Sequence, residues 1–326
     1  MVRGKAGKAV QGKANAKRFA AIDIGTNTIL LLVAELKENG AFQVLEDQAE
    51  ITRLGEGVDR THRIGFDGER RSLDALRGYL ERCKALGVDE VVAVGTSALR
   101  DARNTEDFKA RLKQELGLEL RVLSGEEEAG YSYLGVQRGL SLEEEEVLVV
   151  DVGGGSTELI WAREGELYRS ASLDMGSVRL TERFLPSDPV QEEEFARLTT
   201  AIDGGLAPLL IDWGTYVCFY TMVGIAGTFT TLAAVEKGLS RYSHGEVHGS
   251  RLSRAEVQRQ LNLFKGKTIA ERREIAGLEP KRADVILAGT LVIDRIMALF
   301  RLEQVIVSDQ GIRYGLLHER LGTFHG

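Results

Sequence analysis

The feature that most constrains this chain is a short motif that occurs twice, 128 residues apart. Residues 21–28 read AIDIGTNT, and residues 149–157 read VVDVGGGST. In both, an apolar strand carries an Asp near its end, a turn of small and polar residues follows, and a second apolar run begins at once. This is the pattern of a β-hairpin. A hairpin repeated at this spacing predicts two similar domains that face each other.

The turns of both hairpins consist of residue types that bind phosphate. Glycine lets backbone N–H groups approach an anion closely, consecutive N–H groups form an anion-binding nest, and Ser and Thr hydroxyls add hydrogen-bond donors. The alternative is a pair of ordinary tight turns without a ligand. The predicted phosphate contacts in these turns are Gly25, Thr26, Gly153, Gly154, Gly155, Ser156 and Thr157.

The Asp of each hairpin, Asp23 or Asp151, would repel a phosphate that it faced directly. It supports phosphate binding if it holds Mg²⁺, directly or through water, and the metal bridges to the phosphate oxygens. We therefore predict a Mg²⁺ cofactor, with Mn²⁺ as a possible substitute. In the ligand-free alternative, each Asp only caps its turn.

A third Gly/Thr segment, residues 224–228, follows an apolar strand and precedes a predicted helix. Backbone N–H groups at a helix N-terminus bind phosphate. Gly227 and Thr228 are therefore further predicted contacts, although strand–Gly–helix turns are also common without a ligand.

Strands and helices alternate along the whole chain, which is typical of the α/β class. Apolar runs predict strands at 18–24, 29–36, 91–94, 118–123, 147–152, 157–162, 216–225 and 306–307, and the apolar spacing predicts helices around 73–86, 96–103, 105–116, 190–202, 228–237, 253–264, 281–300 and 311–321. Thr105 is a predicted N-cap. Ser124 opens another helix with Glu127 as its capping-box partner, which leaves Glu128 free to point elsewhere.

Composition and charge exclude several classes of protein. Hydrophobic residues make up 43% of the chain, and no apolar stretch approaches the roughly 20 residues of a membrane span. The net charge is −7, although residues 1–19 hold six cations and no acid. We expect residues 1–18 to form a basic flexible tail and the acidic remainder to bind no specific nucleic acid. With only two cysteines, we expect a cytoplasmic protein without a membrane partner.

Five segments carry a family resemblance. They read DIGTNT at 23–28, GTSALRDARN at 95–104, SGEEEA at 124–129, DVGGGSTE at 151–158 and MGSVRLTER at 175–183. Together they resemble the exopolyphosphatase/guanosine pentaphosphate phosphatase (Ppx/GppA) family, within the actin/sugar-kinase/Hsp70 superfamily. The resemblance runs from about residue 19 to the C-terminus.

This resemblance implies a fold. We expect two ribonuclease H-like (actin-like ATPase) domains that face a central cleft, in the short form without a C-terminal HD-type domain. Residues 19–124 plus 303–326 are assigned to domain I, and residues 125–302 to domain II.

The resemblance also implies roles for individual residues. Glu128 matches the glutamate that acts as general base on the attacking water. Asp151 and Glu158 match acidic positions that bind or orient Mg²⁺, with Asp23 as their counterpart across the cleft. The family's phosphate-contacting positions correspond to Asn27, Arg100, Gly153 and Ser156. One departure is Tyr314, where the family commonly has Glu.

The implied activity is Mg²⁺-dependent release of the terminal phosphate of inorganic polyphosphate, of guanosine pentaphosphate, or of both. Two alternatives stay open: a module that senses guanosine tetra- or pentaphosphate with little turnover, and a kinase of the same superfamily. The family often forms homodimers, so a homodimer is also expected. A long polyphosphate favours an extended basic wall, for which the candidates are Arg179, Arg183, Lys237, Arg241, Arg251 and Arg254.

Overall fold

A computed structural model of the chain describes residues 17–37, 41–140, 142, 146–214 and 219–323. Most of the predicted basic tail, residues 1–16, lies outside this part. Arg18 does not belong to a tail, because it is the first residue of strand β1. Within the described residues, no helix combines the length and apolarity needed to cross a bilayer.

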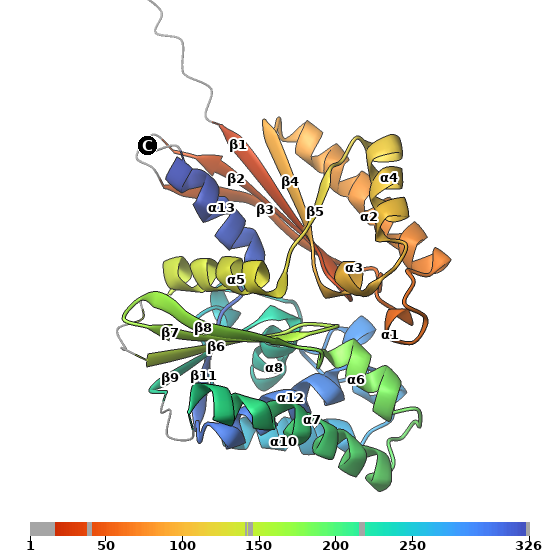
Figure 1. Cartoon of the computed structure of the whole chain (residues 1–326), viewed down its shortest axis with the longest axis vertical. Coiled ribbons are helices and arrows are strands. Elements are labelled where there is room, and N and C mark those ends of the chain that lie inside the picture. The colour runs from red at the N-terminus through yellow and green to blue at the C-terminus, as the bar shows by residue number, and fades with distance from the viewer. Residues whose placement is uncertain (1–16, 38–40, 141, 143–145, 215–218, 324–326) are drawn as a thin grey trace, which may run out of the picture.

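The structure contains two sheets that repeat one topology (Figure 1). The first has the order β3-β2-β1-β4-β5, and the second has the order β8-β7-β6-β9-β11 with β10 added at its edge. In each, the first three strands in the chain are antiparallel, and two further strands, β4 and β5 or β9 and β11, run parallel to the first. The strands are β1 (Arg18–Ile24), β2 (Thr28–Leu36), β3 (Phe42–Ile51), β4 (Glu90–Gly95), β5 (Leu120–Val122), β6 (Glu146–Val152), β7 (Thr157–Arg163), β8 (Glu166–Leu173), β9 (Thr221–Ile225), β10 (Arg251–Ser253) and β11 (Gln304–Val307).

Helices cover both faces of each sheet. Domain I contains α1 (Val58–Thr61), α2 (Phe66–Ala85), α3 (Ser97–Asp101), α4 (Thr105–Leu116) and α13 (Ile312–Thr323). Domain II contains α6 (Ser177–Phe184), α7 (Glu192–Trp213), α8 (Ala226–Glu236), α9 (His244–Val247), α10 (Arg254–Lys265), α11 (Ile269–Arg272), the 3₁₀ turn η1 (Pro280–Arg282) and α12 (Ile286–Leu299). Helix α5 (Gly125–Gly139) lies with α13 between the two sheets (Figure 1).

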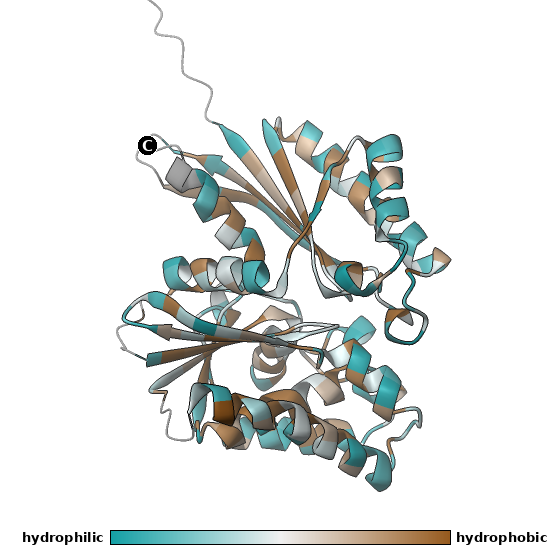
Figure 2. Ribbon diagram, in the orientation of Figure 1, coloured by the Kyte–Doolittle hydropathy of each residue, from teal (hydrophilic) through white to brown (hydrophobic). Residues whose placement is uncertain are grey.

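The apolar residues form cores on the faces of the sheets. One core packs the first sheet against α2 and α4, and the largest packs the second sheet against α7, α8, α10 and α12. Two smaller clusters, one including Tyr131 and Leu316 and one including Ala129 and Val136, bury α5 and α13 between the sheets. Figure 2 shows this pattern, with apolar residues along the strands and hydrophilic residues on outward helix faces.

These findings confirm the predicted α/β class, the two domains and both hairpins. The assignment of 303–326 to domain I is wrong at its start, because β11 pairs with β9 and β10 in the second sheet. Only α13 returns to domain I. The helix predicted at 281–300 begins at Ile286, after a separate 3₁₀ turn. Thr105 is not an N-cap: Asn104 holds that position, and the Thr105 hydroxyl donates to the carbonyls of Leu99 and Ala102.

Candidate active site

The two hairpin turns present backbone donors toward the space between the domains. In each turn the first glycine closes the hairpin, with the Gly25 amide donating to Thr28 O and the Gly153 amide donating to Ser156 O. In the described part of the chain, the amides that follow, those of Thr26 and Gly154 among them, donate no backbone hydrogen bond. Unpaired successive amides of this kind form an anion-binding nest.

The turns converge and touch each other. A Cβ added to Gly154 would lie 3.0 Å from the Cβ of Thr26, and a Cβ added to Gly155 would overlap Ser97 Oγ. Glycine is therefore required here for close approach between the domains. Asn27 lies beside this contact, with a buried side-chain amide whose oxygen and nitrogen both lack a hydrogen-bond partner. An unsatisfied buried amide is costly, which fits a position that binds a ligand.

Four buried carboxylates lie behind the turns. Asp151 and Glu158 are direct cross-strand partners in β6 and β7, so their side chains lie on the same face of the second sheet. Asp23 lies near the end of β1, and Glu128 lies in the first turn of α5. All four are at most 9% exposed.

Burial and mutual repulsion change the protonation of these groups. Burial, reinforced by repulsion from Glu128, raises the pKa of Asp23 to about 8 and that of Asp151 to about 7. The same causes raise the pKa of Glu158 well above its usual value. Burial also raises the pKa of Glu128, and the Arg100 guanidinium partly offsets this effect. Such a cluster is stable as carboxylates only if a cation neutralises it.

The cluster fits a divalent cation, on the evidence of its unpaired oxygens. Oδ1 of Asp23 and Oε2 of Glu158 are buried without a hydrogen-bond partner, whereas Asp151 accepts from Ser132 Oγ and Glu158 Oε1 accepts from Ser172 Oγ. Carboxylate oxygens are the ligands that Mg²⁺ prefers. Among the described residues, no three His, Cys, Asp or Glu side chains form a direct ligand set.

The position of Glu128 follows from the local sequence. The predicted capping box is confirmed, because Ser124 Oγ accepts from the Glu127 amide and the Glu127 carboxylate accepts from the Ser124 amide. Glu127 thus stays at the surface and Glu128 turns inward. Arg100 Nη1 donates to Glu128 Oε2 at 2.5 Å and to Leu123 O at 3.1 Å.

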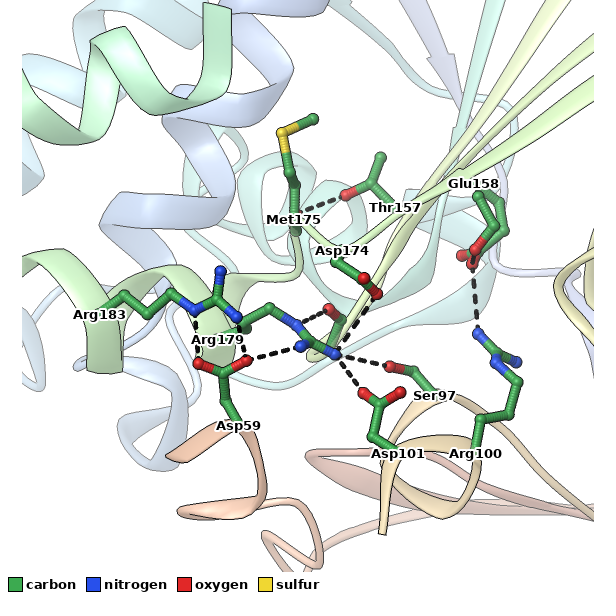
Figure 3. Close-up of polar contacts among 12 residues, drawn as sticks. Asp59, Ser97, Arg100, Asp101, Thr157, Glu158, Asp174, Met175, Arg179 and Arg183 are labelled. Carbon is green, nitrogen blue, oxygen red and sulfur yellow. Dashed lines mark hydrogen bonds and ion pairs between the residues drawn. The ribbon is translucent and has the colours of Figure 1, made fainter. Parts of the chain in front are cut away.

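Arg179 joins the two domains at one mouth of this interface (Figure 3). The residue is 8% exposed, and its guanidinium contacts Asp59 at 2.6 Å and Asp101, both from domain I. Its Nε also donates to Gly155 O at 2.7 Å. The cavity at this mouth measures only about 10 Å³, enough for about one water. The domains are therefore closed on this side.

The expected basic wall does not include the arginines of α6. Arg183 also binds Asp59, and these two arginines lower the pKa of Asp59 although burial opposes the shift. Another candidate, Arg254, lies 3.5 Å from Asp294. All three cations are paired with carboxylates, which makes them less available to a polyanion.

The third loop faces the first hairpin through an arginine that the sequence analysis missed. Arg282 packs against Gly227 and donates from Nη2 to Thr28 Oγ1 at 3.2 Å. Helix α8 begins here without a side-chain cap. The cation and the helix N-terminus together favour an anion between domains. In the sequence, Arg282 follows another cation, Lys281, and no local pattern distinguishes it from an ordinary surface arginine.

Two predicted phosphate contacts use their hydroxyls elsewhere. Thr157 is fully buried and donates to Met175 O at 2.8 Å (Figure 3). Thr228 donates to Val152 O at 3.3 Å. These hydroxyls hold the second hairpin in place, and the predicted phosphate contacts of Thr157 and Thr228 stay predictions.

Tyr314 lies apart from the acidic cluster. It packs in a small core with Leu32 and Leu317, and its hydroxyl donates to Asp47 Oδ2 at 3.2 Å. Asp47 also binds Arg313. The departure at this position therefore leaves the four carboxylates unchanged.

Comparison with known proteins finds relatives named as exopolyphosphatases and solved structures of Ppx/GppA proteins. The model of the Ppx/GppA phosphatase family matches residues 32–324. Exopolyphosphatase 2 of Mycobacterium tuberculosis is 36% identical over 311 residues, which cover 92% of this chain and 97% of the relative. The crystal structure of the Aquifex aeolicus family member has a TM-score of 0.79 at 35% identity and covers 95% of this chain and 99% of its own. The crystal structure of an exopolyphosphatase from Cytophaga hutchinsonii has a TM-score of 0.88 at 28% identity, with coverage of 94% and 98%.

Proposed function

The chain belongs to the Ppx/GppA phosphatase family, and we propose that it is a Mg²⁺-dependent phosphohydrolase that releases the terminal phosphate of inorganic polyphosphate. The observation that carries this proposal is the convergence of the two hairpin turns beside four buried carboxylates. Donors for phosphate oxygens lie on one side of the site, and acidic groups for a cation and a base lie on the other. The names of the relatives, several of which are exopolyphosphatases, favour polyphosphate as the substrate.

In the proposed reaction, Glu128 accepts a proton from the attacking water. The water oxygen bonds to the terminal phosphorus as the bond from phosphorus to the bridging oxygen breaks, and the shortened chain leaves with that oxygen. The amides of the two turns and the guanidinium groups of Arg100 and Arg282 bind the negative oxygens of the terminal phosphate. The enzyme thereby positions the groups and supplies charge, as phosphoryl transfer requires.

Asp23, Asp151 and Glu158 would hold the Mg²⁺ or Mn²⁺ ion. Bound there, the cation would neutralise charge on the phosphate oxygens. The unpaired oxygens of Asp23 and Glu158 support this assignment, since an unpaired buried carboxylate is expensive without a counter-ion.

Phosphate release from purified protein tests the proposal, with and without Mg²⁺, on tripolyphosphate, long polyphosphate and guanosine pentaphosphate. We expect release from polyphosphate that depends on the divalent ion. Release from guanosine pentaphosphate at comparable kcat/KM would extend the substrate range to the nucleotide. No release from any of the three, with binding of guanosine tetra- or pentaphosphate retained, would favour a sensor. Transfer to an acceptor other than water would favour a kinase.

A further inference from the structure

A basic groove opens on domain I beside the candidate active site. It is formed by α3, the start of α4 and β5, and its volume is about 620 Å³, within the usual range of ligand sites. Four cations line it, namely Arg100, Arg103, Lys109 and Arg121, against one acid, Glu106. Such an excess of cations is notable because the whole chain carries a net charge of −7.

The cations of this groove differ in how far they are neutralised. Lys109 pairs with Glu106 at 2.9 Å, and Arg121 pairs with Glu127. Arg103 is exposed, and its side chain forms no hydrogen bond or ion pair with any described residue. Helix α4 begins at the groove without a side-chain cap, and Glu106 and Asp107 in its first turn offset the positive end of the helix, so the basic character of the groove comes from its side chains.

Arg100 is shared by the groove and the active site. This side chain lines the groove and also reaches Glu128 at 2.5 Å and Glu158 at 3.8 Å. The opposite mouth, closed by Arg179, has room for about one water. Of these two cavities, only the groove that Arg100 lines has room for further phosphates of a chain that ends at Glu128.

We propose that this groove binds the phosphates that follow the terminal one in a linear inorganic polyphosphate. The inference rests on the proposed function and adds the path of the substrate. A single-stranded nucleic acid is disfavoured, because base binding relies on aromatic stacking and no Phe, Tyr or Trp lines the groove. A chain of phosphates without bases needs only the cations.

A binding measurement in the Glu128→Gln background tests this path without turnover. The groove variant is Arg103→Ser with Lys109→Ser. Its matched control is Lys84→Ser with Lys113→Ser, which removes two exposed cations of domain I that do not line the groove. We expect the groove variant to weaken binding of long polyphosphate about tenfold relative to tripolyphosphate, with a shallower dependence of affinity on salt. We expect the control variant to leave that ratio unchanged.

Three outcomes would overturn the proposal: no binding of long polyphosphate, equal weakening by both double variants, or competition by a single-stranded RNA homopolymer as strong as that by polyphosphate. Phosphate release by the unaltered protein is measured in parallel. Groove-dependent binding without release would refute the proposed function and leave the groove assignment supported. Phosphate release from both chain lengths, with no effect of the groove variant on binding, would support the proposed function and refute the groove assignment.

Discussion

Arg100 and Glu128 form an ion pair across the entrance to the acidic cluster, with Nη1 of the arginine 2.5 Å from Oε2 of the glutamate. Arg100 comes from α3 of domain I, and Glu128 comes from α5 between the sheets. The same arginine lies 3.8 Å from Glu158. An anionic substrate would compete for this guanidinium, so the pair connects substrate binding to the state of the proposed base.

Removing Arg100 should change the pH dependence of the reaction. The guanidinium lowers the pKa of Glu128, so Arg100→Ala should raise it further. Because the base must be ionised, we expect the acidic limb of kcat/KM to move to higher pH, together with a higher KM for polyphosphate. Arg100→Lys, which keeps the charge, is the control and should shift the limb less. An unchanged limb in Arg100→Ala would contradict the role given to this pair.

Glu128→Gln should separate catalysis from binding. Loss of a general base lowers kcat by about 10²–10⁴-fold, whereas the turns and the arginines that bind phosphate remain. Single-turnover phosphate release and equilibrium binding of tripolyphosphate check the two effects. Glu127→Gln is a matched control on the same helix, since Glu127 caps the helix at the surface. Equal losses of kcat in both variants would refute the general-base assignment.

The arginine at the closed mouth should contribute to stability. Arg179→Ala leaves Asp59 and Asp101 without a largely buried partner, and breaking such a pair costs about 3 kcal/mol. Arg183→Ala removes a partner of Asp59 whose side chain is 48% exposed and should cost less than about 1 kcal/mol. Urea denaturation measures both. Equal destabilisation by the two variants would contradict the larger contribution expected from the buried pair.

Stability without a divalent ion should fall as the pH rises. The folded protein holds protons on Asp23 and Asp151 up to about pH 8 and 7, whereas the unfolded chain releases them near pH 3.8. The contribution is therefore fully present below pH 3.8 and is lost as the pH rises through these folded-state values. Mg²⁺ at a hundredfold excess over its Kd should restore about 2.7 kcal/mol, as thermal denaturation can measure. Asp23→Asn should flatten the profile, and an unchanged profile would contradict the assignment.

A second pH dependence should come from the loop after β11. The hydrogen bond to Asp309 raises the pKa of His244, and the same carboxylate raises that of His248 at 3.0 Å. This stabilisation is present below pH 6.5 and disappears as the pH rises through the raised values. Asp309→Asn should therefore destabilise the fold more at pH values below 6.5 than well above. A loss of stability independent of pH would show that the histidines are not involved.

The local sequence pattern predicted the structural elements whose geometry depends on residues close together in the chain. The two hairpins form where the sequence predicted them, because apolar strands on either side of a short turn that contains glycine specify that geometry within a few residues. The capping box at Ser124 directs Glu128 inward for the same reason. Strand β3 and the edge strands β8 and β10, which are only partly buried, carried too weak an apolar pattern to be predicted.

The amino-acid sequence by itself therefore determines the two hairpin turns, their acidic residues and the α/β class, since each depends on residues a few positions apart. Folding alone brings Arg179 to Asp59, which is 120 positions earlier, and Arg282 to Thr28, 254 positions earlier. It also places β11 in the second sheet and brings the Thr157 hydroxyl to Met175 O, to which it donates a hydrogen bond. Such partners depend on how the two sheets pack across their shared interface. The charge or hydroxyl group of one residue does not predict which distant group will lie next to it.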